Sequence, residues 1–383
     1  MSYIITLIIF IILLSLLIVV HELGHMIVAI KRGVIVNSFA LGFGPKLYSF
    51  NHNNIEYRIN LLPFGGYVSL FGDDDPGNKI KGSLSAATAL SKFMITIAGV
   101  FMNLILALIF LFIFLFSINF KFYYSNIIPN FKFTFGQNVN NILFSRINSD
   151  KTSTLSKDNI NGLYLIKSIN NVPIHSISQI QKIVDQNKGK YLYFNYSYVK
   201  NINLYGIDLG KVSRAKFLAR KNFPKNSGSI GISIQSISHI EFTSVQSKIF
   251  SVIAFPYDVL QLTFQGFGYL INQSIVQKNS KIITTQIAGP IGIYMYTNIL
   301  FQNDGFTGLL FIFGIISLSL AFMNLLPIPP LDGFYVLLSI LEGFFSIKIN
   351  EKWMYYISMA GVIFFIILMI FVTFNDLINF KII

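Results

Sequence analysis

Residues 3–25, YIITLIIFIILLSLLIVVHELGH, decide the fold, because an unbroken apolar run leads directly into the motif His21-Glu22-Leu23-Gly24-His25. A run of this length predicts a membrane-spanning helix, which needs roughly 20 apolar residues. Two histidines at positions i and i+4 share one helical face, and the glutamate beside the first can act on a metal-activated water. Since ionisable residues at membrane depth are costly, the motif indicates a metal site inside a span.

The composition agrees with a membrane protein. Of 383 residues, 53% are hydrophobic and only 12% are charged. The net charge of +13 comes from scattered lysines, which favours contact with anionic membrane lipids over nucleic acid binding. The chain has no cysteine, so any zinc must be held by histidine and carboxylate. The first apolar run lacks a basic leader and a small-residue cleavage site, so we expect a retained anchor.

Four apolar stretches are long enough to cross a bilayer, and we therefore predict a polytopic α-helical membrane protein. A straight helix through the third stretch would be about 50 Å long, which exceeds a hydrocarbon core of roughly 30 Å. Prolines 327, 329 and 330 split it, so that a second piece opens at Asp332-Gly333. The predicted spans cover residues 1–30, 93–116, 305–343 and 353–376.

Asp332 is the only charged residue between Gly305 and Leu341. Irregular backbone at this depth persists only where it is buried in protein or lines a wet cavity. With four spans, the first and third run in the same direction, so His21, His25 and Asp332 fall near the same side of the membrane. The sequence thus predicts one site built from distant parts of the chain.

Basic residues in the short connections predict which side this is. Lys and Arg concentrate on the cytoplasmic side of membrane proteins. This places the site near the cytoplasm and residues 121–300 outside, where a long translocated domain escapes the charge rule. The basic residues of the two connections are Lys31, Arg32, Lys46, Arg58, Lys79, Lys81 and Lys92, followed by Lys348 and Lys352.

The segments between the spans predict β-structure. Glycines bracket extended stretches in residues 31–92, which indicates a β-hairpin; it either dips into the membrane face or lies in the cytoplasm. Residues 121–245 hold a small α+β module. Its signals are a strand at 163–169, a turn at Asn170-Asn171, a helix opening at Ser176 or Ser178 and running through Val184, and a strand at 191–198. Residues 250–300 predict an interfacial helix and linker rather than a fifth span.

Zinc catalysis needs three protein ligands and an open position. His21 and His25 supply two, and Asp332 is the predicted third. Glu22 would serve as general base and then return a proton to the leaving amine. An isolated HExxH in a soluble helix is often only polar surface, and an Asp before Gly is commonly a turn residue. The remaining histidines, His52, His175 and His239, lie in polar segments and are expected at the surface.

The chain resembles the site-2 protease family of intramembrane zinc metalloproteases, in particular the bacterial regulator-of-sigma-E-protease type. The resemblance covers the length of the chain. It rests on the HELGH motif of the first span, Gly42-Phe43-Gly44-Pro45, residues 63–68 (PFGGYV), residues 289–293 (GPIGI) and residues 324–333 (NLLPIPPLDG).

This resemblance implies site roles. It implies that His21, His25 and Asp332 bind Zn²⁺ and that Glu22 is the catalytic acid/base. It also implies that Asn324 helps to hold an unwound substrate strand and that the loop from Gly42 to Gly44 meets substrate. Pairing of a strand with a sheet edge is physically reasonable, because a helix must open before its peptide bonds reach a metal. For Asn324, a helix–helix contact is the alternative.

The outer module resembles a PDZ domain, although Asn171 replaces the family's usual glycine. The chain also departs from the family at residues 99–103 (GVFMN) and at Phe334. The expected protein is an intramembrane protease of a bacterial inner membrane, with transmembrane substrates such as anti-sigma factors or signal-peptide remnants. The alternatives are a catalytically silent binding protein of the same fold, or a cation transporter, which would show broken helices in both halves.

Overall fold

A computed structural model describes residues 2–72, 80–125, 128, 131–146, 162–223, 228–279, 281–347 and 351–381. Lys79, Lys348 and residues 147–161 of the predicted PDZ-like module lie outside this part of the chain. The chain divides into two compact units. Unit 1 contains Met1–Phe114 and Leu270–Ile383, and unit 2 contains Leu115–Tyr269.

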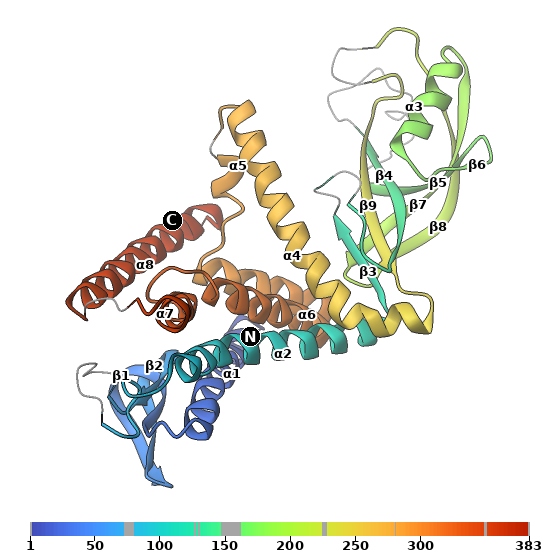
Figure 1. The fold of residues 1–383 in the computed structure, drawn as a ribbon. Helices are drawn as coiled ribbons and strands as arrows, with labels where there is room; N and C mark the ends of the chain where they lie inside the picture. Colours follow the sequence, from blue (N-terminus) through green and yellow to red (C-terminus); the bar gives the residue numbers. More distant parts are fainter. Residues whose placement is uncertain are drawn as a thin grey trace. The chain divides into compact units, whose positions relative to one another are not determined.

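Four long apolar helices of the described chain are candidate membrane spans, which confirms the predicted number. The 32-residue helix α4 (Val245–Val276) is not among these candidates. Figure 1 shows the four helices, which are α1 (Ser2–Lys31), α2 (Ala89–Ser117), α6 (Pro290–Asn324) and α8 (Glu351–Asn379).

Helix α6 begins at Pro290, and a kink at Gly305 separates its first part from residues 306–324, where the third span was predicted. Its first turn is capped by the carboxylate of Asp376 in α8, which accepts hydrogen bonds from the backbone N–H groups of Gly289 and Gly292 at 3.0 and 2.8 Å. Residues 290–300 therefore belong to a helix, not to a linker. Gly305 has non-helical backbone angles (φ 59°, ψ −137°), so α6 consists of two helical parts that meet at a kink.

The proline break falls where the sequence predicted it. Helix α6 ends at Asn324, a turn containing the three prolines follows, and the shorter helix α7 (Asp332–Phe345) begins at Asp332. Proline stops a helix because its nitrogen has no hydrogen to donate and its ring clashes with the preceding turn. The turn therefore leaves Asp332 at the first position of a helix.

The predicted hairpin is a folded sheet. Strand β1 (Val36–His52) pairs antiparallel with β2 (Ile55–Leu70). Residues 38–41 pair with 66–69 on one side and with 56–59 on the other, so each long strand bends and contributes twice. Gly42 and Gly44 form the bend of β1, both with φ +85°, and a Cβ on Gly42 would lie 2.3 Å from the Leu62 carbonyl oxygen. Only glycine fits such a bend.

The sheet packs against the end of α1 and the start of α2. Val36, Phe39 and Ile55 of the sheet share a buried cluster with Met26 of α1 and Ile95 of α2. In Figure 1, β1 and β2 lie beside α1 accordingly. Other large apolar side chains of the sheet are exposed. They are Phe43, Leu47, Tyr48, Phe50, Ile59, Leu61 and Leu62.

The helices of unit 1 pack through apolar side chains. Phe10 and Leu17 of α1 form a buried cluster with Leu309 and Phe313 of α6, against which Leu106 of α2 packs. This cluster fixes α1, whose last turns carry the HExxH motif, between two other spans. Helix α5 (Lys281–Thr284) is a single turn.

Unit 2 contains a seven-stranded sheet and the short helix α3, followed by most of helix α4 (Figure 1). Its strand order is β3-β9-β4-β5-β7-β8, with β6 paired to β5. The predicted turn is formed by Asn170 and Asn171, both with positive φ, and helix α3 opens with a capping box between Ser176 and Gln179. The strands are β3 (Lys121–Ser125), β4 (Gln137–Arg146), β5 (Leu163–Ile169), β6 (Val172–Pro173), β7 (Tyr191–Asn203), β8 (Gly206–Leu218) and β9 (Ile232–Glu241), and the helix is α3 (Ile177–Gln186).

One expectation for unit 2 is wrong. His52 and His175 are exposed as predicted, but His239 is buried, with only 5% of its surface accessible. Its ring stacks on Tyr123 with centroids 4.6 Å apart. The imidazole has a polar partner inside the protein, because the side-chain amide of Asn141 lies 3.0 Å from its Nδ1. The polar neighbours in the sequence therefore do not indicate a surface position. Burial lowers the pKa of His239.

Candidate metal centre

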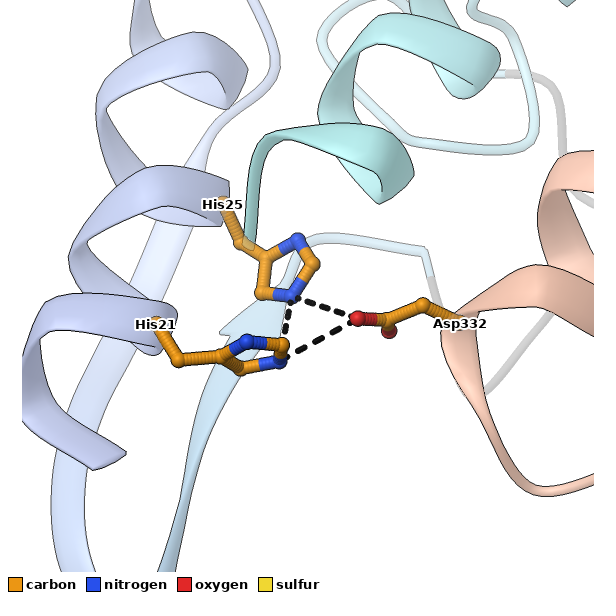
Figure 2. A group of neighbouring side chains, drawn as sticks. All are labelled: His21, His25 and Asp332. Carbon is orange, nitrogen blue, oxygen red and sulfur yellow. Dashed lines mark hydrogen bonds and ion pairs between the residues drawn. The ribbon is translucent and has the colours of Figure 1, made fainter. Parts of the chain in front are cut away.

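Three predicted ligands meet in unit 1, from two helices far apart in the chain. His21 and His25 lie one turn apart on α1, and Asp332 is the first residue of α7 (Figure 2). Oδ2 of Asp332 lies 3.1 Å from Nε2 of His21 and 3.4 Å from Nε2 of His25. The two histidine nitrogens are 3.2 Å apart. The three atoms thus form a nearly equilateral triangle.

The triangle has the size that zinc requires. Zinc binds histidine nitrogen and carboxylate oxygen at about 2.0–2.2 Å with tetrahedral geometry, which places neighbouring ligand atoms about 3.4 Å apart. Oδ2 of Asp332 is buried, and among the described residues it faces only the two histidine nitrogens. The three side chains are only 12%, 13% and 20% exposed. The donor set therefore fits a zinc ion.

The tautomer of His25 also fits. Its Nδ1 lies 2.8 Å from the backbone carbonyl oxygen of Ile95 in α2. A carbonyl oxygen can only accept, so Nδ1 carries the proton and donates it. The lone pair then resides on Nε2, the atom that faces Asp332. Metal-binding histidines are commonly oriented in this way through their second nitrogen.

Two glycines allow α1 and α2 to approach closely at the site. A Cβ on Gly24 would lie 2.5 Å from the carbonyl oxygen of Ala98. A Cβ on Gly99 would lie 2.3 Å from Nε2 of His25 and 2.7 Å from Cε1 of His21. Any side chain at Gly99 would therefore collide with the two imidazoles. The glycine of HELGH is explained in the same way, by the space between helices.

Glu22 lies between α1 and the sheet. Its carboxylate lies near the backbone of Val68 in β2, and it interacts electrostatically with His21, His25 and Asp332. A Cβ on Gly66 would lie 3.3 Å from Cγ of Glu22. Glu22 thus lies beside the three candidate ligands, and residues 66–68 of β2 lie next to it.

The other predicted site residues are not members of this cluster. Asn324 is the last residue of α6, before the proline turn. Gly42 and Gly44 form the bend of β1, where the carbonyl oxygen of Gly42 accepts a hydrogen bond from Asn60 at 2.9 Å. Sequence reasoning missed the contribution of α2, in particular the Asn103 side chain, although Asn103 is the only amide in the charge-free residues 93–116.

The fold and the site together define a class: a multi-pass membrane protein in which an HExxH helix and a distant aspartate meet in one candidate metal centre. The profile described as Peptidase family M50 matches residues 9–368. The chain belongs to peptidase family M50, a family of zinc metalloproteases. It is therefore a peptide-bond hydrolase, and its cofactor is Zn²⁺.

Individual relatives agree with this family. A Campylobacter jejuni protein named "Putative zinc metalloprotease Cj1068" is 31% identical over 376 residues, covering 96% of this chain and 92% of the relative. The "Zinc metalloprotease RasP" of Bacillus licheniformis is 26% identical over 430 residues, covering 97% of this chain and 98% of the relative. The similarity thus extends over nearly the whole length of both chains.

Proposed function

We propose that this metalloprotease cuts peptide bonds within membrane-spanning segments of single-span proteins, near the cytoplasmic face of a bacterial inner membrane. The observation that carries the proposal is the triangle of His21, His25 and Asp332, built between helices long enough to span. A substrate that reaches this triangle must do so at membrane depth. Anti-sigma factors and signal-peptide remnants are the proposed substrate types.

The proposed ligands are His21, His25 and Asp332. Zinc supplies a Lewis acid that polarises the water and the scissile carbonyl. Glu22 is the proposed acid/base: its carboxylate takes a proton from the attacking water and delivers it to the leaving amide nitrogen. Its position one residue after His21 supports this role, because it is beside the ligands without belonging to the ligand face.

We further propose that the sheet presents the substrate to Glu22. Residues 66–69 pair with β1 on one side only, and Gly66 and Val68 both lie against Glu22. An opened substrate strand pairing with this edge would bring its peptide bonds to the acid. The bend at Gly42 and Gly44 and the amide of Asn324 are proposed to meet the same strand. Unit 2 is proposed as a PDZ-like domain outside the membrane, acting as a peptide binder or a size filter.

The test is cleavage of a model single-span substrate by the purified full chain in detergent, with zinc content measured on the same samples. Wild type is expected to cleave, and Glu22→Gln to lose at least about a hundredfold in rate while keeping its zinc, since a general base contributes about 10²–10⁴-fold. Glu342→Gln is the matched control. It removes a carboxylate of α7 that is paired with Lys92 at 2.8 Å, outside the metal cluster.

Three outcomes are distinguishable. Loss of cleavage in Glu22→Gln alone supports the proposed mechanism. Equal cleavage by wild type and Glu22→Gln removes Glu22 from the chemistry. Zinc binding without cleavage by either protein, across several single-span substrates, favours a binding protein of the same fold.

A further inference from the structure

The two histidines of the metal centre differ in what holds their second nitrogen. Nδ1 of His25 faces the carbonyl oxygen of Ile95, which fixes its tautomer. Nδ1 of His21 faces the side-chain amide of Asn103, with 3.2 Å between Nδ1 and Nδ2. If Nε2 of His21 is to bind a metal, Nδ1 must carry the proton and needs an acceptor.

Asn103 is held where it can be that acceptor. The residue is 1% exposed, and its backbone carbonyl accepts a hydrogen bond from the hydroxyl of Ser317 in α6 at 2.8 Å. Its side-chain oxygen Oδ1 is buried and has no hydrogen-bond partner among the described residues. A buried amide oxygen without a hydrogen-bond partner is energetically unfavourable. Asn103 therefore has an unused acceptor within its own amide, next to a ring nitrogen that lacks one.

A half-turn of the Asn103 amide would place its Oδ1 next to Nδ1 of His21. Rotation about χ2 exchanges Nδ2 and Oδ1 while leaving the shape of the side chain unchanged. Oδ1 then takes the place of Nδ2 and accepts the hydrogen of His21 Nδ1. The lone pair of His21 stays on Nε2, in the triangle with His25 and Asp332.

We propose that Asn103 is a positioning residue of the metal centre, whose side-chain oxygen fixes the tautomer and orientation of His21. This inference rests on the proposed ligand set. With this role for Asn103, helix α2 supports both histidines from behind. Its residues Ile95, Gly99 and Asn103 follow one another at intervals of four residues and so lie on one helical face. Ile95 and Asn103 hold the two imidazoles, and Gly99 leaves the space for them.

The test is the zinc dissociation constant of the purified full-length protein, measured by competition with a chromophoric chelator. Asn103→Leu keeps a similar shape without the acceptor and is expected to weaken zinc binding about 10- to 100-fold, the usual effect of losing such a partner. Asn103→Asp keeps an acceptor at the same place and is expected to stay within about threefold of wild type. Asn298→Leu, which removes another buried amide, paired with Thr6 at 3.0 Å and outside the metal cluster, is the matched control and is expected to change zinc binding little.

Thermal unfolding of the metal-free variants separates folding from metal binding. If Asn103→Leu folds and binds zinc as tightly as wild type, the inference is overturned. It is also overturned if Asn103→Asp, folded, loses as much affinity as Asn103→Leu, because an acceptor would then not be the relevant property. If wild type itself binds no stoichiometric zinc, the proposed ligand set is wrong. That result differs from the two outcomes that would exclude only the role of Asn103.

Discussion

At the scale of single residues, the proposed metal centre depends on one oxygen atom, Oδ2 of Asp332. His21 and His25 lie one turn apart on α1, so the helix alone keeps them together. Oδ2 of Asp332 completes the triangle from another helix and has no other partner in the described part of the chain. The third ligand is therefore the part of the site that the tertiary fold must supply.

Asp332→Ala should lower zinc binding by removing this ligand. We expect wild type to retain about one zinc per chain after dialysis against a weak chelator, and the variant to fall close to zero, because catalytic zinc is held by three protein ligands. Zinc per protein, measured by elemental analysis, is the readout. Asp185→Ala, on the exposed face of α3, should keep the wild-type content. Full retention by Asp332→Ala would exclude Asp332 as a ligand.

The three predicted ligands could be found from the sequence because each carries a strong local signal. Ionisable side chains stand out in apolar spans, and the prolines indicated where the third span breaks. The supporting contacts could not be found in this way. The carbonyl oxygen of Ile95 has no side-chain signal at all, and the contact of Asn103 with His21 depends on how α1 and α2 are rotated about their axes.

At the scale of elements, the start of α6 shows why helix boundaries were less predictable. The N–H groups of Gly289 and Gly292 are satisfied by Asp376, which lies more than 80 residues later in α8. No residue close to Gly289 in the sequence predicts that Asp376 caps the start of this helix. The folded sheet is similar: glycines indicated its bends, but not that residues 38–41 pair on both sides.

Asp376→Ala should destabilise unit 1, since it removes both hydrogen bonds at the start of α6. Loss of a helix cap costs about 0.5–2 kcal/mol, and here the two N–H groups would remain buried. We expect a lower unfolding temperature in detergent. Asn379→Ala removes one longer bond, 3.2 Å to the Thr284 carbonyl, and should have the smaller effect. Equal melting temperatures for Asp376→Ala and wild type would show that the cap contributes nothing.

At the scale of the whole molecule, the four spans and the basic connections predict a topology. The number of spans is supported by the helices themselves. Their direction across the membrane rests on the distribution of Lys and Arg and on the parity of the spans. The chain contains no cysteine, so a single introduced thiol can report this direction without background.

His52→Cys and His175→Cys form a matched pair for this purpose. Both positions are exposed, the first in the sheet between spans one and two and the second in unit 2. A membrane-impermeant maleimide should label His175→Cys in intact spheroplasts, and His52→Cys only after the membrane is permeabilised. Labelling in the reverse pattern would invert the proposed topology, and labelling of both in intact spheroplasts would contradict the number of spans between them.

The order of the proposed ligands along the chain has a consequence for biosynthesis. His21 and His25 lie in the first candidate span, whereas Asp332 follows unit 2 and three of the four candidate spans. A growing chain therefore carries Glu22 and two of the proposed ligands while the whole of unit 2 is still being made, without the third. The proposed metal centre can be completed only after Asp332 has been synthesised, so the protease would remain inactive towards neighbouring nascent membrane proteins until that point.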